Sequence, residues 1–290
     1  MRMMIFGAGY SGQAIAAEAL KAGAEVSGTT RSPEKSALLR QQGIQPFLFD
    51  GTALSAELRQ SLAEVTHLVQ SIAPGAAGDS LLTLTNGDLR SLFPKLEWAG
   101  YLSTVGVYGD HGGAWVTEDT PCRPVSQRSV ERVAAEEGWQ VAAEMAGIPV
   151  AILRLSGIYG PGRNGFVNLA QGTARRLVKP GQVFNRIRVE DIGRACRFLI
   201  ERQLGGIFNI TDAEPAPPQD VVTEAARLMG VEPPPEQAFE TAELSPMARS
   251  FYGENKRVSN AKLCNLGFEF LFPDYRTSLR QLWSDAVWKP

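Results

Sequence analysis

The chain has 290 residues, 44% of them hydrophobic, and this length predicts one large α/β unit with an added lobe. A formal charge of −2 provides no basic field for nucleic acid or an anionic membrane. Three widely spaced cysteines without a C-x-x-C pair argue against a disulfide framework and a thiolate metal site. Because the N-terminus leads directly into a strand and no long apolar run follows, we expect a cytoplasmic protein without a membrane partner.

The first predicted element is a short apolar strand that breaks into a G-x-G-x-x-G loop and an alanine-rich helix. Gly7 permits the tight turn, Gly9 lets the backbone approach a pyrophosphate, and Gly12 allows the helix to pack closely on the strand. The phosphates would bind at the helix N-terminus, beside Tyr10 and Ser11. A glycine-rich turn in an unrelated α/β protein is the alternative, but the flanking strand and helix favour dinucleotide binding.

The second predicted strand, residues 25–30, indicates which dinucleotide is bound. An NAD site usually has a carboxylate at the tip of this strand, whereas an NADP site has a cation for the 2′-phosphate. No carboxylate is present there, and Arg31 offers a guanidinium beside the hydroxyls of Thr30 and Ser32. The sequence therefore favours NADP over NAD. Ser32 can also be the N-cap of a helix with Pro33 at its first position, which would leave Arg31 free.

Strand-like runs then alternate with helical ones, which predicts a doubly wound parallel sheet covered on both faces, the Rossmann fold. Ligands of such sheets bind beyond the carboxyl ends of the strands. This rule places Asp50 near the adenine, Ser71 and Ala73 along the cofactor, and Thr104 near the reactive ring; each can instead be an ordinary turn residue. The predicted strands are residues 44–49, 66–72, 98–103 and 150–155.

The C-terminal part is richer in proline, with two clusters that flank a predicted helix over residues 219–229. We interpret this region as a smaller lobe that closes over the cofactor and supplies substrate contacts. One cluster there, residues 249–257, alternates basic and aromatic side chains. Arg249 and Tyr252 are its candidates for binding an anionic substrate, unless the segment is only a surface loop.

Four later segments follow the glycine loop in a recognisable order. They are L-S-T-V-G-V-Y-G at 102–109, R-L-S-G-I-Y-G-P-G at 154–162, R-I-R-V-E-D-I at 186–192 and G-I-F-N-I at 206–210. Together they resemble the extended, atypical short-chain dehydrogenase/reductases, the NAD-dependent epimerase/dehydratase-like family. The resemblance implies a dinucleotide-binding domain over 1–160, with 186–212 returning to the sheet, and a smaller substrate-binding lobe formed by 161–185 and 213–290.

In that family a Ser or Thr, a Tyr and a Lys carry out proton transfer. Thr104 falls at the first of these positions, and matching Glu136 to the family's glutamate puts Arg132 at the lysine position and Arg128 at the tyrosine position. An arginine stays protonated, so Arg128 cannot act as the usual acid and base. Arg132 could still contact the nicotinamide ribose. Alternatively, both arginines belong to a solvated helix face.

Another group would then have to supply the proton. His111, in a glycine-rich loop, normally titrates near neutral pH, although a loop histidine is often only solvated. Tyr108 and Tyr159 lie nearby in the motifs but more often pack than react, and Tyr108 is also a candidate substrate contact. The resemblance places further substrate contacts after the sixth-strand turn, at Arg163 and Asn164.

Two functions follow from these patterns. The first is an NADP-dependent oxidoreductase or epimerase/dehydratase-like enzyme, without the usual Tyr-x-x-x-Lys pair, for a small polar substrate that can be nucleotide-linked. The second is a non-catalytic NADP-binding sensor or carrier. The retained Thr104 and the anion-binding cluster favour an enzyme. Members of the resembling family often pair exposed helices into dimers, so a homodimer is also an expectation.

Overall fold

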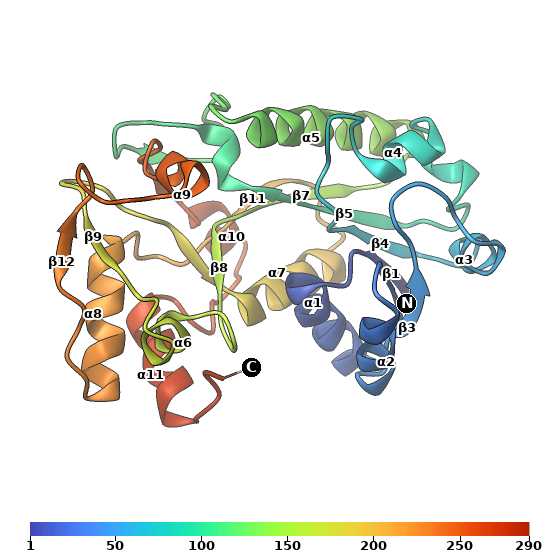
Figure 1. Cartoon of the computed structure of the whole chain (residues 1–290). Coiled ribbons are helices and arrows are strands. Elements are labelled where there is room, and N and C mark those ends of the chain that lie inside the picture. The colour runs from blue at the N-terminus through green and yellow to red at the C-terminus, as the bar shows by residue number, and fades with distance from the viewer. Residues whose placement is uncertain (290) are drawn as a thin grey trace. The chain divides into compact units, whose positions relative to one another are not determined.

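A computed structural model describes residues 1–289, apart from the side chain of Met247, and Figure 1 shows the order of its elements along the chain. The chain divides into two compact units. The first unit contains residues 1–107, 126–154 and 192–208, and the second contains residues 108–125, 155–191 and those from Asn209 onward. Each unit is assembled from segments that are distant in sequence.

The central sheet has seven strands in the order β11-β7-β5-β4-β1-β2-β3. Ile5 lies opposite Gly28 on one side and Val69 on the other, in parallel register. This arrangement confirms the predicted doubly wound parallel sheet. The strands are β1 (Arg2–Phe6), β2 (Glu25–Thr30), β3 (Gln45–Leu48), β4 (His67–Gln70), β5 (Trp98–Thr104), β7 (Val150–Leu155) and β11 (Gly206–Ile210).

Helices cover both faces of this sheet, α4 and α5 on one and α1, α2 and α7 on the other (Figure 1). The central strands are accordingly apolar without alternation, and all six residues of β7 are buried. On the α5 side, Tyr101 of β5 stacks on Trp139 with 6.1 Å between ring centres. The helices of the first unit are α1 (Tyr10–Lys21), α2 (Pro33–Gln41), α3 (Ala56–Leu62), α4 (Ser80–Thr85), α5 (Gln127–Ala146) and α7 (Val189–Glu201).

As far as residue 289, the second unit contains three two-stranded parallel pairs and five α-helices. The pairs are β8 (Gly157–Tyr159) with β10 (Arg186–Arg188), β9 (Arg176–Val178) with β12 (Glu236–Ala238), and β6 (Trp115–Val116) with β13 (Arg257–Val258). The helices are α6 (Gly165–Ala170), α8 (Pro218–Met229), α9 (Pro246–Phe251), α10 (Ala261–Asn265) and α11 (Tyr275–Ser284). Helix α8 confirms the helix predicted between the proline clusters. Within residues 1–289, the helices are all too short or too polar to cross a bilayer.

Candidate functional site

The loop between β1 and α1 turns through Gly7. This residue has φ of 84°, a backbone conformation that favours glycine, and its N–H donates to Thr29 Oγ1 at 2.9 Å. A Cβ at Gly7 would lie 3.0 Å from the Ile72 side chain, in the segment that follows β4. The turn therefore brings the end of β1 against the ends of two neighbouring strands.

The other two glycines of the loop have different surroundings. A Cβ at Gly12 would lie 2.9 Å from the Gly7 carbonyl oxygen, so this position must be glycine for α1 to pack on the turn. A Cβ at Gly9 would meet only that oxygen, at 3.9 Å, and would otherwise point into open space. Gly9 caps α1 without a side-chain hydrogen bond, which leaves the first turn of the helix, including Ser11, open to an anion. The loop thus fits a pyrophosphate.

The tip of β2 confirms one predicted role, the Ser32 cap, and leaves Arg31 exposed for the other. Ser32 is the N-cap of α2, because its Oγ accepts the Lys35 N–H at 3.3 Å and Pro33 occupies the first helical position. The N–H of Ser32 donates to Thr30 Oγ1 at 3.2 Å. Arg31 is exposed and has no hydrogen bond or ion pair within the described part of the chain. Its guanidinium is free to bind a ligand.

The residues that follow β3 and β4 differ in whether their side chains form hydrogen bonds within the protein. The exposed Asp50 carboxylate accepts the N–H of Thr52 at 2.9 Å and its hydroxyl at 2.7 Å, and the hydroxyl in particular lowers the pKa of Asp50. Ser71 is partly buried and its N–H donates to the Phe6 carbonyl oxygen at 2.9 Å, while Ala73 is exposed. Their predicted contacts with the cofactor stay predictions.

Arg132 ties helix α5 to the end of β5. Its Nη1 donates to the Leu102 carbonyl oxygen and, at 3.2 Å, to the Tyr101 hydroxyl. Burial raises the pKa of Tyr101 to about 12. Thr104, the last residue of β5, accepts the Gly106 N–H at 3.1 Å through its Oγ1. Arg132 and Thr104 therefore lie at the same end of β5, whereas Arg128 is exposed one helical turn earlier.

A buried charged group lies one turn further along α5. Glu136 accepts from Arg154 Nη2 at 2.7 Å and from Arg154 Nε at 3.2 Å, and it also accepts from the Ser103 hydroxyl. The Glu136 and Arg154 side chains are 3% and 4% exposed. These contacts join α5 to β5 through Ser103 and to β7 through Arg154. Glu136, the residue matched to the family's glutamate, therefore has a structural role.

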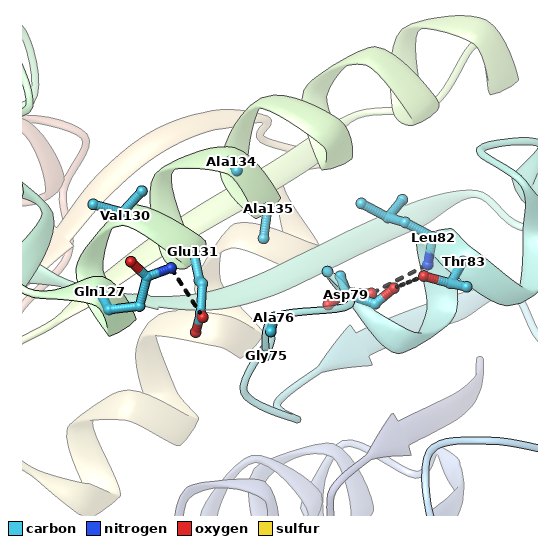
Figure 2. Close-up of a pocket in the computed structure, with 11 residues that line it drawn as sticks. Gly75, Ala76, Asp79, Leu82, Thr83, Gln127, Val130, Glu131, Ala134 and Ala135 are labelled. Carbon is cyan, nitrogen blue, oxygen red and sulfur yellow. Dashed lines mark hydrogen bonds between the residues drawn. The ribbon is translucent and has the colours of Figure 1, made fainter.

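A cavity of about 500 Å³ lies between the loop after β4, α4 and α5 (Figure 2). Asp79, the N-cap of α4, accepts the N–H groups of Leu81 and Leu82 beside it, and Gln127 Nε2 donates to Glu131 Oε1 at 3.3 Å. The sequence patterns described above do not predict this cavity. The one feature that could have indicated it is the small-residue segment that begins at Gly75, after β4. Its lining residues are Gly75, Ala76, Gly78, Asp79, Leu82, Thr83, Gln127, Val130, Glu131, Ala134 and Ala135.

The candidates for a replacement acid lie in the second unit. Tyr108 is completely buried, and its hydroxyl donates to Asn209 Oδ1 at 2.7 Å. His111 is partly buried, with Nε2 at 3.1 Å from the Tyr108 carbonyl oxygen. These contacts hold both side chains in place within this unit, and their predicted roles toward a substrate stay predictions.

The remaining substrate candidates also lie in the second unit. Asn164 is buried as the N-cap of α6, accepting the Val167 N–H at 3.1 Å, while Arg163 is exposed beside it. Tyr252 is 8% exposed and stacks on Phe239 with ring centres 4.8 Å apart. Arg249 lies over the same ring, 5.0 Å from its centre, and donates to the Ala242 carbonyl oxygen at 2.8 Å. Among these four, Arg163 and Arg249 are the exposed side chains.

Comparisons with known proteins agree with this fold. The family model described as "NAD dependent epimerase/dehydratase family" matches residues 3–211. Protein YeeZ of Escherichia coli strain K12 is 30% identical over 289 residues, which cover 94% of this chain and 97% of YeeZ. A conserved protein of unknown function from Silicibacter pomeroyi DSS has a structure with a TM-score of 0.88 and 42% identity, covering 98% of this chain and 99% of that one.

More distant structures share the fold alone. Human epimerase family protein SDR39U1 with NADPH has a TM-score of 0.75 at 16% identity, covering 98% of this chain and all of that one. Bacterial epimerases and a dehydratase in complex with NAD have the same fold at 17% to 21% identity. Neighbours of this fold therefore bind either NAD or NADPH.

Proposed function

The chain belongs to the NAD-dependent epimerase/dehydratase family, and we propose that it is an NADP-dependent oxidoreductase or epimerase/dehydratase-like enzyme for a small polar substrate. The observation that carries this proposal is the open space at Gly9, beside the uncapped first turn of α1. A phosphate there would receive backbone N–H groups and the positive end of the helix dipole. When bound, the nicotinamide would supply or accept a hydride.

The preference for NADP rests on the tip of β2. Arg31 is exposed and unpaired among residues 1–289, beside the Thr30 hydroxyl and the start of α2. A guanidinium presents a planar set of donors that matches a phosphate, and the tip of β2 has no carboxylate to accept the ribose hydroxyls of NAD. Arg31 would therefore bind the 2′-phosphate.

Arg31→Ala is expected to weaken NADPH binding about tenfold or more and to change NADH binding by less than about twofold, because only NADPH carries the 2′-phosphate. Titration of protein fluorescence with each nucleotide measures both affinities. Arg40→Ala removes another exposed arginine, near the other end of α2, and serves as the matched control. An equal loss of affinity for both nucleotides would contradict the NADP assignment.

The chemistry would have to proceed without a tyrosine at position 128. In this proposal Thr104 orients the substrate through its hydroxyl, and Arg132 supplies positive charge at the same end of β5, where it is held by Leu102 and Tyr101. Neither group is an ordinary proton donor at neutral pH, so another side chain would have to act as the general acid. The alternative proposal, a sensor or carrier of NADP, is favoured by this replacement of the tyrosine and lysine with arginines.

A further inference from the structure

Asp212 in the second unit has a buried carboxyl group, and one of its two oxygens has no hydrogen-bond partner among the described residues. The residue is 1% exposed; its Oδ1 accepts the Glu214 N–H at 3.2 Å, whereas Oδ2 has no hydrogen-bond partner in the described structure. Burial raises the pKa of Asp212 to about 8, against the opposing influence of Arg186. Buried carboxyl oxygens are rarely left without a partner, so this one requires an explanation.

A second unused group lies close to it. Tyr159, on β8, has a buried hydroxyl without a hydrogen-bond partner among the residues described. Ser278 is its polar neighbour, and the Ser278 Oγ accepts from Arg188 Nη1 at 3.0 Å. Burial raises the pKa of Tyr159, and the charges of Asp212 and Arg186 both influence it. The backbone brings the two groups to the same strand: the Asp212 N–H donates to the Arg186 carbonyl oxygen at 2.7 Å, and Tyr159 lies opposite Arg188 in the β8–β10 pair. We treat the phenol and the carboxyl as one cluster on this basis.

Arg186, on the strand next to β8, completes the cluster. Its Nη1 donates to the Phe184 carbonyl oxygen at 2.9 Å and to the Ala216 carbonyl oxygen at 3.1 Å, which fixes the orientation of the guanidinium. Among residues 1–289, the hydrogen bonds of this guanidinium are both made by Nη1, which leaves Nε and Nη2 available to a ligand. Burial lowers the pKa of Arg186. It lies within electrostatic reach of Asp212 and Tyr159 without forming an ion pair with the carboxyl group.

We propose that Arg186, Asp212 and Tyr159 form a binding site for an oxyanion, phosphate or carboxylate, that carries a neighbouring hydroxyl group. The free edge of the fixed guanidinium matches a planar or tetrahedral oxyanion, and the unused carboxyl and phenol oxygens match the hydroxyl. This inference rests on the proposed function, because such a compound would be the small polar substrate. It also explains why two buried polar atoms, the Tyr159 hydroxyl oxygen and Asp212 Oδ2, have no hydrogen-bond partner among the described residues.

The test is calorimetric titration of the full-length protein, without nucleotide, using four probes. Glycerol 3-phosphate and glycerate carry an oxyanion with hydroxyls, inorganic phosphate lacks the hydroxyls, and glycerol lacks the anion. We expect at least one of the first two to bind about tenfold more tightly than inorganic phosphate, with no binding of glycerol. Binding of glycerol 3-phosphate alone identifies phosphate as the anion, and binding of glycerate alone identifies carboxylate. No binding of either overturns the proposal.

Variants assign the binding to these residues. Arg186→Gln should lower the affinity for the bound probe about tenfold or more. Asp212→Asn and Tyr159→Phe should reduce the ratio of the affinity for that probe to the affinity for inorganic phosphate. Arg280→Gln removes an exposed arginine of the same unit and is the matched control. If Arg186→Gln does not fold, the two conservative variants still decide the outcome. Unchanged affinities in the folded variants overturn the proposal.

The same variants separate this site from the proposed function. Arg186→Gln should bind NADPH as the unmodified protein does, because the nucleotide loop belongs to the first unit. Absence of NADPH binding in the unmodified protein would contradict the proposed function and leave the oxyanion site standing. Normal NADPH binding without any binding of the probes would contradict only the oxyanion site.

Discussion

Gly9→Val is expected to reduce NADPH binding by about a hundredfold or more while leaving the thermal unfolding of the nucleotide-free protein nearly unchanged. Gly9 has φ of −83° and ψ of −153°, an extended conformation outside the left-handed region that favours glycine, and its Cβ would point into open space. The added methyl groups would occupy the space assigned to the pyrophosphate. Fluorescence titration and a thermal melt measure the two quantities.

Gly12→Ala is the informative comparison for that variant. Its Cβ would lie 2.9 Å from the Gly7 carbonyl oxygen and 3.1 Å from the Ile5 side chain, so the strand and the helix would have to move apart. We expect this variant to lose about 1 to 3 kcal/mol of stability as well as nucleotide affinity. If Gly9→Val instead bound NADPH normally, the glycine loop would not be the pyrophosphate site.

Glu136→Gln is expected to lower the free energy of unfolding by about 3 to 5 kcal/mol, because it leaves the Arg154 guanidinium buried without its carboxylate. Glu136 and Arg154 are almost fully enclosed, and Arg154 donates to both carboxylate oxygens. The Ser103 hydroxyl would also lose a charged acceptor. Urea denaturation at neutral pH measures the change.

Glu137→Gln provides the control, because Glu137 is the next residue of α5 and is exposed. It should change the free energy of unfolding by less than about 0.5 kcal/mol. A loss of similar size in both variants would show a general effect of charge on α5 rather than a buried ion pair. A loss below about 1 kcal/mol for Glu136→Gln would contradict the structural role assigned to this carboxylate.

The parallel sheet could be predicted from the sequence because central strands such as β1 and β7 are buried and are therefore largely apolar runs. The predicted bounds of β2 and β7, residues 25–30 and 150–155, agree with the structure. The side chains at the strand ends were harder to predict. The carboxylate of Asp50 at the end of a strand predicts a ligand contact, but in the structure it accepts a hydrogen bond from the Thr52 hydroxyl. Local sequence does not reveal which strand-end side chains remain free.

The second unit was harder to predict because its contacts join distant, very short segments. Strand β6 has two residues, and Trp115 pairs with Arg257 far along the chain. The Asp212 cluster likewise depends on how β8, β10 and the segment after β11 come together. No periodicity in the sequence marks such contacts, and a lone aspartate after a strand reads as a turn residue. The sequence pattern indicates Tyr159 only as a candidate proton donor.

A crystal structure of the protein with NADPH bound tests the central claim most directly. The account predicts the pyrophosphate within hydrogen-bonding distance of the backbone N–H groups in the first turn of α1, the 2′-phosphate against Arg31, and the nicotinamide ring near Thr104 and Arg132. A nucleotide bound away from the Gly7–Gly12 loop, or a 2′-phosphate that makes no contact with Arg31, would contradict it.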